Sequence, residues 1–189
     1  MKPVWRKVWP AVAAVAVVQT AVLGWMVADR VRLLANGLEV VLPIVPVDPR
    51  SLFRGDYVRL SYDVTRVPGA LIEGPMRRHE PLFVTIERQP DGTMRPVAAG
   101  RVHPGAAAAD KVVLRGRIER ERRTGAAASD LIVSYGIESY FVPEGTGLEL
   151  EKMARESKLA AVIAVGGDGR SAIKGLMIDG KLAYEEPLF

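Results

Sequence analysis

The stretch PVDPRSLFRGDYVRLSYDV, residues 46–64, begins with turn-forming residues and ends in regular alternation. Its last apolar positions recur at every second residue, at Val58, Leu60, Tyr62 and Val64. A period of two is typical of a β-strand with one buried face, because successive side chains point to opposite sides of a sheet. Before it, Asp48-Pro49 suits a turn, and Gly55 can adopt a positive φ. We therefore predict a turn followed by a half-buried strand over residues 57–64.

The same alternation extends along most of the chain. Residues 38–44 form an apolar stretch that contains Pro43, so we expect an edge strand there. Two hairpins are predicted next, residues 82–88 with 94–102 and residues 111–123 with 131–142. In the last of these strands, the alternation places one set of residues on one face, namely Tyr135, Ile137, Ser139 and Phe141. The opposite face receives Gly136, Glu138, Tyr140 and Val142.

The C-terminal part adds one helix and a three-stranded meander. Thr146 and Glu149 have the spacing of a capping box, so a helix of two or three turns is predicted from that point. Residues 159–167, 169–178 and 180–186 then alternate with glycine-containing turns. The predicted fold class is mainly β (α+β). It comprises one N-terminal transmembrane helix followed by an antiparallel β-sandwich or barrel-like domain with one short helix.

The N-terminal segment contains a long, mainly apolar run without charge. Residues 8–27, VWPAVAAVAVVQTAVLGWMV, carry no charge, and at about 1.5 Å per residue they span a ~30 Å hydrocarbon core. The alternative is a cleaved signal peptide, but this run is longer than a signal h-region, and Met26-Val27-Ala28 is a poor cleavage site. We expect an uncleaved signal anchor over residues 1–30, a juxtamembrane linker over 31–37 and an exported β-rich domain over 38–189.

The distribution of charge indicates an orientation and excludes one class of partner. Three basic residues precede the apolar run, and two follow it beside an aspartate: Lys2, Arg6 and Lys7, then Arg30 and Arg32 with Asp29. The more positive flank is usually cytoplasmic. In a chain of bacterial, alanine- and arginine-rich composition, this predicts a single-pass protein of the inner (cytoplasmic) membrane, with its N-terminus cytoplasmic and its C-terminal domain periplasmic. Beyond residue 35 the basic and acidic residues balance, so nucleic-acid binding is not expected.

The opening stretch also resembles a known family. Gly55-Asp56-Tyr57-Val58-Arg59-Leu60-Ser61-Tyr62 fits, position by position, the signature of the GDYXXLXY family of uncharacterised bacterial membrane-anchored proteins. YGIESYFVPEGTGLELE, residues 135–151, and GRSAIKGLMIDG, residues 169–180, are similar to the same family. The resemblance covers the exported domain nearly end to end. It implies a membrane-anchored topology and association with multi-spanning membrane proteins, and it assigns no catalytic residue.

Two segments carry the candidate binding residues. The first contributes Arg54, Gly55, Asp56, Tyr57, Arg59 and Tyr62, and the second contributes Tyr135, Glu138, Tyr140 and Glu144. Glu138 lies among apolar residues, where a carboxylate needs a cation or a hydrogen-bond donor, and Arg54 or Arg59 could be that partner. Such a pair would be either structural or part of a polar, aromatic recognition face. The leading hypothesis is a non-enzymatic accessory or binding domain that acts with an integral membrane protein.

The alternative hypothesis is a membrane-anchored hydrolase that uses a serine and a lysine. Its candidates are Ser51, Ser61, Lys111 and Lys174, although none lies in an S-x-x-K or G-x-S-x-G context. The chain has no cysteine, and its two histidines, His79 and His103, are isolated. We therefore expect no thiol nucleophile, no metal site and no cofactor. The expected partners are the lipid bilayer, through the N-terminal helix, and a membrane protein.

Overall fold

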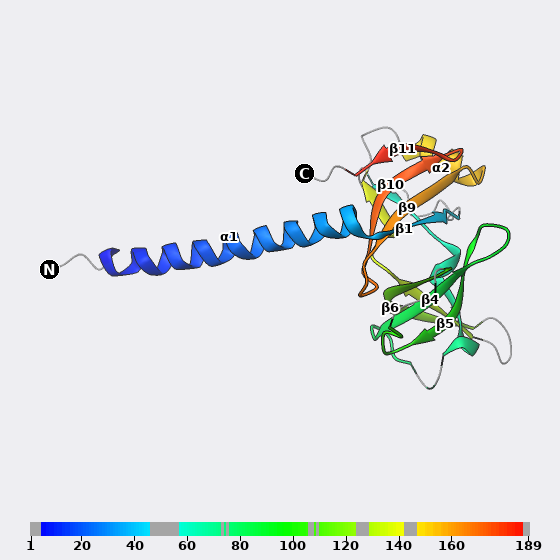
Figure 1. Cartoon of the computed structure of the whole chain (residues 1–189), viewed down its shortest axis with the longest axis horizontal. Helices are drawn as coiled ribbons and strands as arrows, with labels where there is room; N and C mark the ends of the chain where they lie inside the picture. Colours follow the sequence, from blue (N-terminus) through cyan, green and yellow to red (C-terminus); the bar gives the residue numbers. More distant parts are fainter. Residues whose placement is uncertain are drawn as a thin grey trace.

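The computed structural model shows a long helix that leads into a β domain made of two main sheets (Figure 1). It describes residues 5–45, 57–72, 74, 76–105, 108, 110–123, 129–141 and 147–186. The β domain lies at the C-terminal end of the helix, and the rest of the helix projects away from it (Figure 1). The predicted class, a mainly antiparallel β domain after one long apolar helix, is confirmed.

Helix α1 (Trp5–Asn36) is 32 residues long. Among the described residues, it alone is long and apolar enough to cross a membrane. Residues 9–28 are all exposed, which suits a lipid environment better than water. The helix also continues through residues 31–36, the stretch predicted as a linker. Gly37 alone separates it from the first strand.

The first main sheet has four antiparallel strands in the order β1-β9-β10-β11. These are β1 (Leu38–Pro43), β9 (Leu159–Val165), β10 (Ser171–Ile178) and β11 (Lys181–Glu185). β1 is an edge strand, as the proline at its end predicts. β9 is buried along most of its length because the end of α1 covers one side of the sheet and the second sheet lies toward the other.

The second main sheet has five antiparallel strands in the order β3-β7-β6-β4-β5. They are β3 (Arg66–Pro68), β7 (Ser129–Ser134), β6 (Lys111–Arg123), β4 (Pro81–Arg88) and β5 (Met94–Gly100). A parallel bridge between Ile72 and Ala99 brings the segment after β3 to the opposite edge of the sheet. This sheet is therefore barrel-like and nearly closed.

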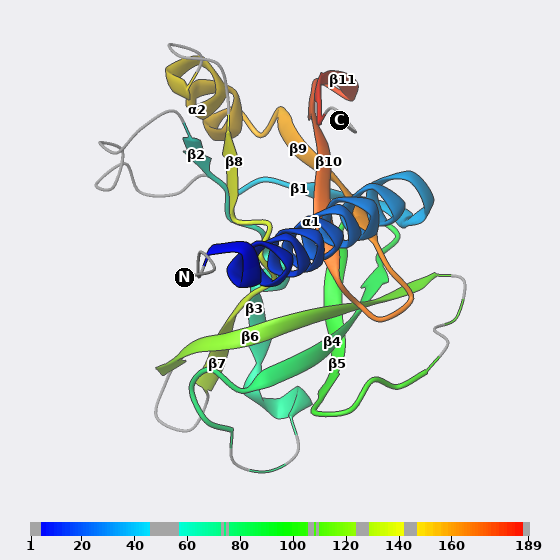
Figure 2. The ribbon, with the colours of Figure 1, turned by 90° about the vertical axis from the view of Figure 1, so that its left-hand side faces the viewer.

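A two-stranded ribbon joins the two sheets. β2 (Tyr57–Arg59) pairs with β8 (Ser139–Phe141), and α2 (Gly147–Arg155) lies beside them (Figure 2). Thr146, the predicted cap of this helix, is outside the described residues. Buried side chains from both sheets form one continuous hydrophobic core, which includes Leu42, Leu60, Ile86, Leu114 and Ile163.

Two predicted strands are shorter than the alternation indicated. The strand over residues 57–64 ends at Arg59. It is followed by a bridge at Ser61 and the 3₁₀ turn η2 (Asp63–Thr65), although Leu60, Tyr62 and Val64 are buried as predicted. A second 3₁₀ turn, η3 (Gly69–Leu71), precedes the barrel closure.

The strand predicted over residues 131–142 is interrupted at residues 135–138, so the two faces assigned to it are wrong. Gly136 has φ +80°, a backbone conformation that ends β7 at Ser134. As a result Ile137 and Tyr140, assigned to opposite faces, are both buried, whereas Phe141 is 79% exposed.

Candidate functional site

The stretch GDYVRLSY, residues 55–62, is called the motif below. Its second half is part of the core. Leu60 and Tyr62 are 2% and 1% exposed, respectively. The Tyr62 hydroxyl donates a hydrogen bond to the Ile137 carbonyl at 2.9 Å, and the Leu60 amide donates to the Glu138 carbonyl at 2.9 Å. The motif strand is thus tied to the turn at residues 135–138.

Tyr135 makes the reciprocal connection. Its ring is 6% exposed, and its hydroxyl donates to the Val64 carbonyl at 2.8 Å, back toward the motif segment. Burial raises the pKa of both Tyr62 and Tyr135, and the negative charge of Glu138 raises it further. We call Tyr62 and Tyr135 the tyrosine pair. Both hydroxyls stay neutral and satisfy backbone carbonyls, so their role in this structure is to join two segments.

Glu138 closes the turn with local hydrogen bonds. Its carboxylate accepts from the Tyr135 amide at 2.5 Å, the Gly136 amide at 3.0 Å and the Ser134 hydroxyl at 3.0 Å. These three donors supply the stabilisation that the sequence led us to seek from an arginine. Of the two expected partners, Arg54 lies outside the described residues, and only the backbone of Arg59 is described.

The first half of the motif meets the second candidate segment through the backbone. Tyr57 pairs with Phe141, Val58 with Tyr140 and Arg59 with Ser139, so the two segments predicted to form one face are adjacent. Gly55, Asp56 and Glu144 are outside the described residues. Tyr140 is only 7% exposed and its ring belongs to the core, so the described aromatic surface of this ribbon comes from Phe141.

The serine and lysine candidates for a hydrolase occupy different surroundings. Lys174 on β10 forms an ion pair with Glu39, with 2.6 Å between Nζ and Oε1, and this contact raises the pKa of the lysine. A lysine that activates a serine needs a lowered pKa, so this environment opposes the role. Lys111 Nζ lies 3.7 Å from Glu87 Oε1, Ser61 forms a backbone bridge with Val45, and Ser51 is outside the described residues.

Neither histidine lies in a metal site formed by the part of the chain that the structure describes. His79 has φ 68° in the loop before β4, and its amide donates to the Ile118 carbonyl. His103 Nδ1 accepts from the Gly105 amide at 3.1 Å, and its ring contacts Phe83 edge-on. Among the described residues there is no group of three or more His, Asp or Glu side chains arranged for a metal ion.

The end of α1 forms a junction with the β domain that the sequence did not predict. Leu34, near the end of α1, is 3% exposed and packs against Ala164 of β9 and Ala172 of β10. Arg170, just before β10, holds the Asp29 carboxylate with two guanidinium nitrogens and the Asp168 carboxylate with Nε at 2.6 Å. We call the contacts of Leu34 and Arg170 the helix–domain junction. The only sign of this junction in the sequence was a pair of opposite charges, Asp29 and Arg170, separated by 141 residues.

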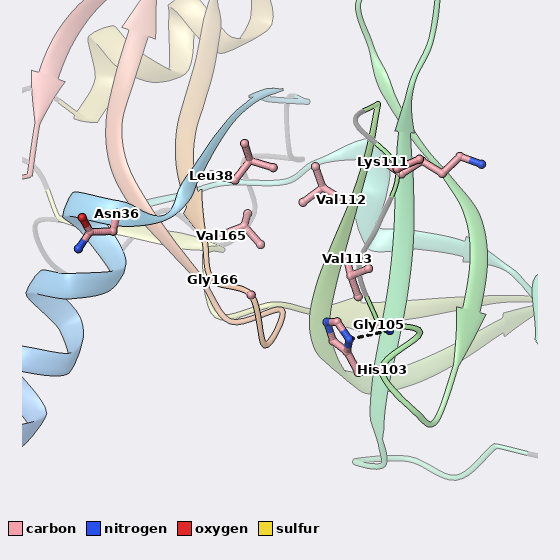
Figure 3. A pocket seen from close by; sticks show the side chains of 11 residues that line it. Asn36, Leu38, His103, Gly105, Lys111, Val112, Val113, Val165 and Gly166 are labelled. Atoms are coloured by element: carbon pink, nitrogen blue, oxygen red, sulfur yellow. Dashed lines mark hydrogen bonds between the residues drawn. The ribbon is translucent and has the colours of Figure 1, made fainter.

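Among the described residues, three hollows lie near this junction, and the two larger ones differ in their lining. The first, about 480 Å³, lies between the two sheets. In it Leu38 and Val165 face Val112 and Val113, and His103 lies at one end (Figure 3). The second, about 560 Å³, lies between the end of α1 and β6. Its charged lining residues are Asp29, Arg30, Arg115, Arg117, Glu119 and Arg170. We call this second hollow the arginine groove.

Comparison with known protein families gives a match. The model of the GDYXXLXY protein family matches residues 19–176, which include most of α1 and the β domain as far as β10. No curated protein and no solved structure matches the chain. The match covers well over half of the chain, and the buried Leu60 and Tyr62 give its signature a structural basis. The chain therefore belongs to the GDYXXLXY family.

Proposed function

We propose that this chain is a membrane-anchored accessory domain of the bacterial inner membrane. Its N-terminus lies in the cytoplasm, and its β domain lies in the periplasm and binds an integral membrane partner. The more basic N-terminal flank of the apolar segment supports this orientation.

The helix–domain junction is the observation that carries the proposal. Gly37 is the only residue between α1 and β1, and its amide donates to the Leu33 carbonyl at 2.9 Å. Buried Leu34 and the Asp29–Arg170 pair then fasten the helix to the sheet. A fixed connection holds each face of the domain at a constant position relative to the bilayer. Such an arrangement suits binding to a neighbour in the same membrane.

The β2–β8 ribbon is the proposed contact surface for this partner. Phe141 is 79% exposed, and no other described aromatic side chain of the β domain is as exposed. Aromatic residues are the side chains that most often anchor protein interfaces. The ribbon also includes the backbone of Tyr57 and Arg59, so the family motif and this surface are parts of one structure.

A crosslinking experiment tests this surface. A photoreactive amino acid in place of the exposed Ser139 should give one dominant adduct with a membrane protein in native membranes. Adding Phe141→Asp should reduce that adduct at least about fivefold, because one buried aromatic anchor is worth more than about 1 kcal/mol. Val102→Asp is the matched control, since Val102 is 80% exposed on the loop after β5, and it should leave the adduct unchanged.

An adduct that does not depend on Phe141, or an equal loss with Val102→Asp, would contradict the proposed surface. The hydrolase alternative has a separate outcome. If Ser51→Ala or Lys174→Ala abolished cellular function while the adduct persisted, catalysis would replace binding as the explanation.

A further inference from the structure

The arginine groove concentrates positive charge in a domain whose basic and acidic residues balance overall. Four arginines line it, together with the two carboxylates of Asp29 and Glu119. Arg170 is already engaged by Asp29 and Asp168. The other three, Arg30, Arg115 and Arg117, form no ion pair with any described residue. All three are exposed, so their guanidinium groups are available to a ligand.

The local backbone explains why these arginines converge. Arg115 and Arg117 are two residues apart on β6 and therefore point to the same side of the strand, while Gly116 between them is buried. Arg30 lies near the end of α1 and lines the same hollow. In Figure 2, viewed from the side of the helix N-terminus, β6 crosses the near side of the domain next to α1. In Figure 1, β6 again lies on the side of its sheet toward the helix N-terminus.

The length of α1 places this groove at the level of the lipid headgroups. Residues 8–28 are uncharged, and 21 residues at about 1.5 Å each match a hydrocarbon core of about 30 Å. The α1 residues that line the groove are Asp29, Arg30 and Leu33, and they follow within five further residues, or about 7.5 Å. The headgroup layer on each side of the core is about 5–8 Å thick.

From the charge of the groove and its position at the level of the headgroups, we propose that the arginine groove binds the phosphate of an anionic phospholipid. This lipid would lie in the leaflet from which α1 emerges. A guanidinium group offers paired donors that match phosphate oxygens, and three such groups surround one opening of sufficient volume. The inference rests on the membrane anchoring in the proposed function but not on the protein partner. The bound lipid would add a second contact between the domain and the bilayer.

The test uses the full-length protein purified in a neutral detergent. Phosphatidylglycerol and phosphatidylcholine are added in equal amounts, and bound lipids are counted by native mass spectrometry. The wild-type protein should retain phosphatidylglycerol preferentially. Arg115→Gln/Arg117→Gln should lower its apparent affinity roughly 30-fold, as expected for two basic groups beside an anionic lipid surface. Phosphatidylcholine should bind equally weakly to both proteins.

Arg95→Gln/Arg120→Gln is the matched control. It removes the same charge from exposed positions on β5 and β6 that do not line the groove, so it should leave phosphatidylglycerol binding within about twofold of wild type. Unchanged thermal melting of both double variants would show that they are folded.

Equal losses in the two double variants, or no loss in either, would overturn the groove as the lipid site. Competition by millimolar inorganic phosphate without any preference for phosphatidylglycerol would also overturn it, because the ligand would then be a free anion. Each result is independent of the crosslinking test, which needs the protein partner and native membranes.

Discussion

The hydroxyl groups of Tyr62 and Tyr135 explain why tyrosines stand at these two positions. Each ring is buried, and each hydroxyl donates to a carbonyl of the other's segment, at 2.9 Å and 2.8 Å. Replacing either tyrosine with phenylalanine keeps the ring and leaves one buried carbonyl without its donor. The last tyrosine of the motif is therefore explained by hydrogen bonding inside the domain, and no ligand is required to account for it.

Alkaline pH should weaken the domain through the tyrosine pair. Their pKa is raised in the folded state, so their contribution to stability is complete below the unfolded pKa of about 10 and decreases as pH rises above it. From pH 9 to pH 11 we expect a loss of about 1.4 kcal/mol for each tyrosine. Circular dichroism melting of the full chain in detergent measures this loss.

The double variant Tyr62→Phe/Tyr135→Phe provides the control for this prediction. At neutral pH it should be less stable by about 1–3 kcal/mol for each lost hydroxyl, but its stability should change less between pH 9 and pH 11. A wild-type protein with the same pH dependence as the double variant would contradict the assigned role of the pair.

At the scale of elements, the junction between α1 and the first main sheet determines how the two parts of the chain are connected. Leu34 is buried between Ala164 and Ala172, two small residues that let the helix approach β9 and β10 closely. Gly37 is required by the same approach, because a Cβ there would lie 2.5 Å from the Leu33 carbonyl oxygen and 3.0 Å from the Ala164 Cβ.

Leu34→Ala should therefore reduce the free energy of unfolding of the β domain by about 2–4 kcal/mol, since it removes a buried leucine. Arg170→Ala should lower the stability much less than Leu34→Ala does, because solvent screens the exposed ion pair that it breaks. Thermal unfolding in detergent, monitored by the circular dichroism signal of the strands, measures both changes. Leu23→Ala, on the exposed part of the same helix, serves as control, and an equal effect there would refute the junction.

The sequence predicted those elements whose signal is local. Alternation located most strands, and the glycine-containing turns separated β9, β10 and β11. The alternation did not predict the break at Gly136, because a single glycine in an alternating strand does not show that its φ is positive. The junction and the arginine groove were also missed. Leu34 continues an apolar helix pattern, and Arg30 meets Arg115 and Arg117 only after the chain has folded.

At the scale of the whole molecule, the proposed topology places the β domain and its hollows on the periplasmic side. Alkaline phosphatase fused after residue 189 should be active, and a reporter that fluoresces only in the cytoplasm should be dark at the same position. The reverse result would put the β domain in the cytoplasm and would exclude a periplasmic partner. Lipid binding at the groove would then be expected in the cytoplasmic leaflet.

Because Gly37 alone connects α1 to β1, the length of α1 determines the direction in which the β domain faces around the helix axis. Because an α-helix turns by about 100° per residue, one residue added between Trp25 and Asp29 would rotate the entire β domain by about 100° about the helix axis. Two added residues would turn the ribbon that carries Phe141 almost to the opposite side of the helix axis. Seven added residues would return this ribbon almost to its original direction. The proposed membrane partner would thus meet Phe141 only for certain lengths of α1, and these lengths recur with the period of the helix.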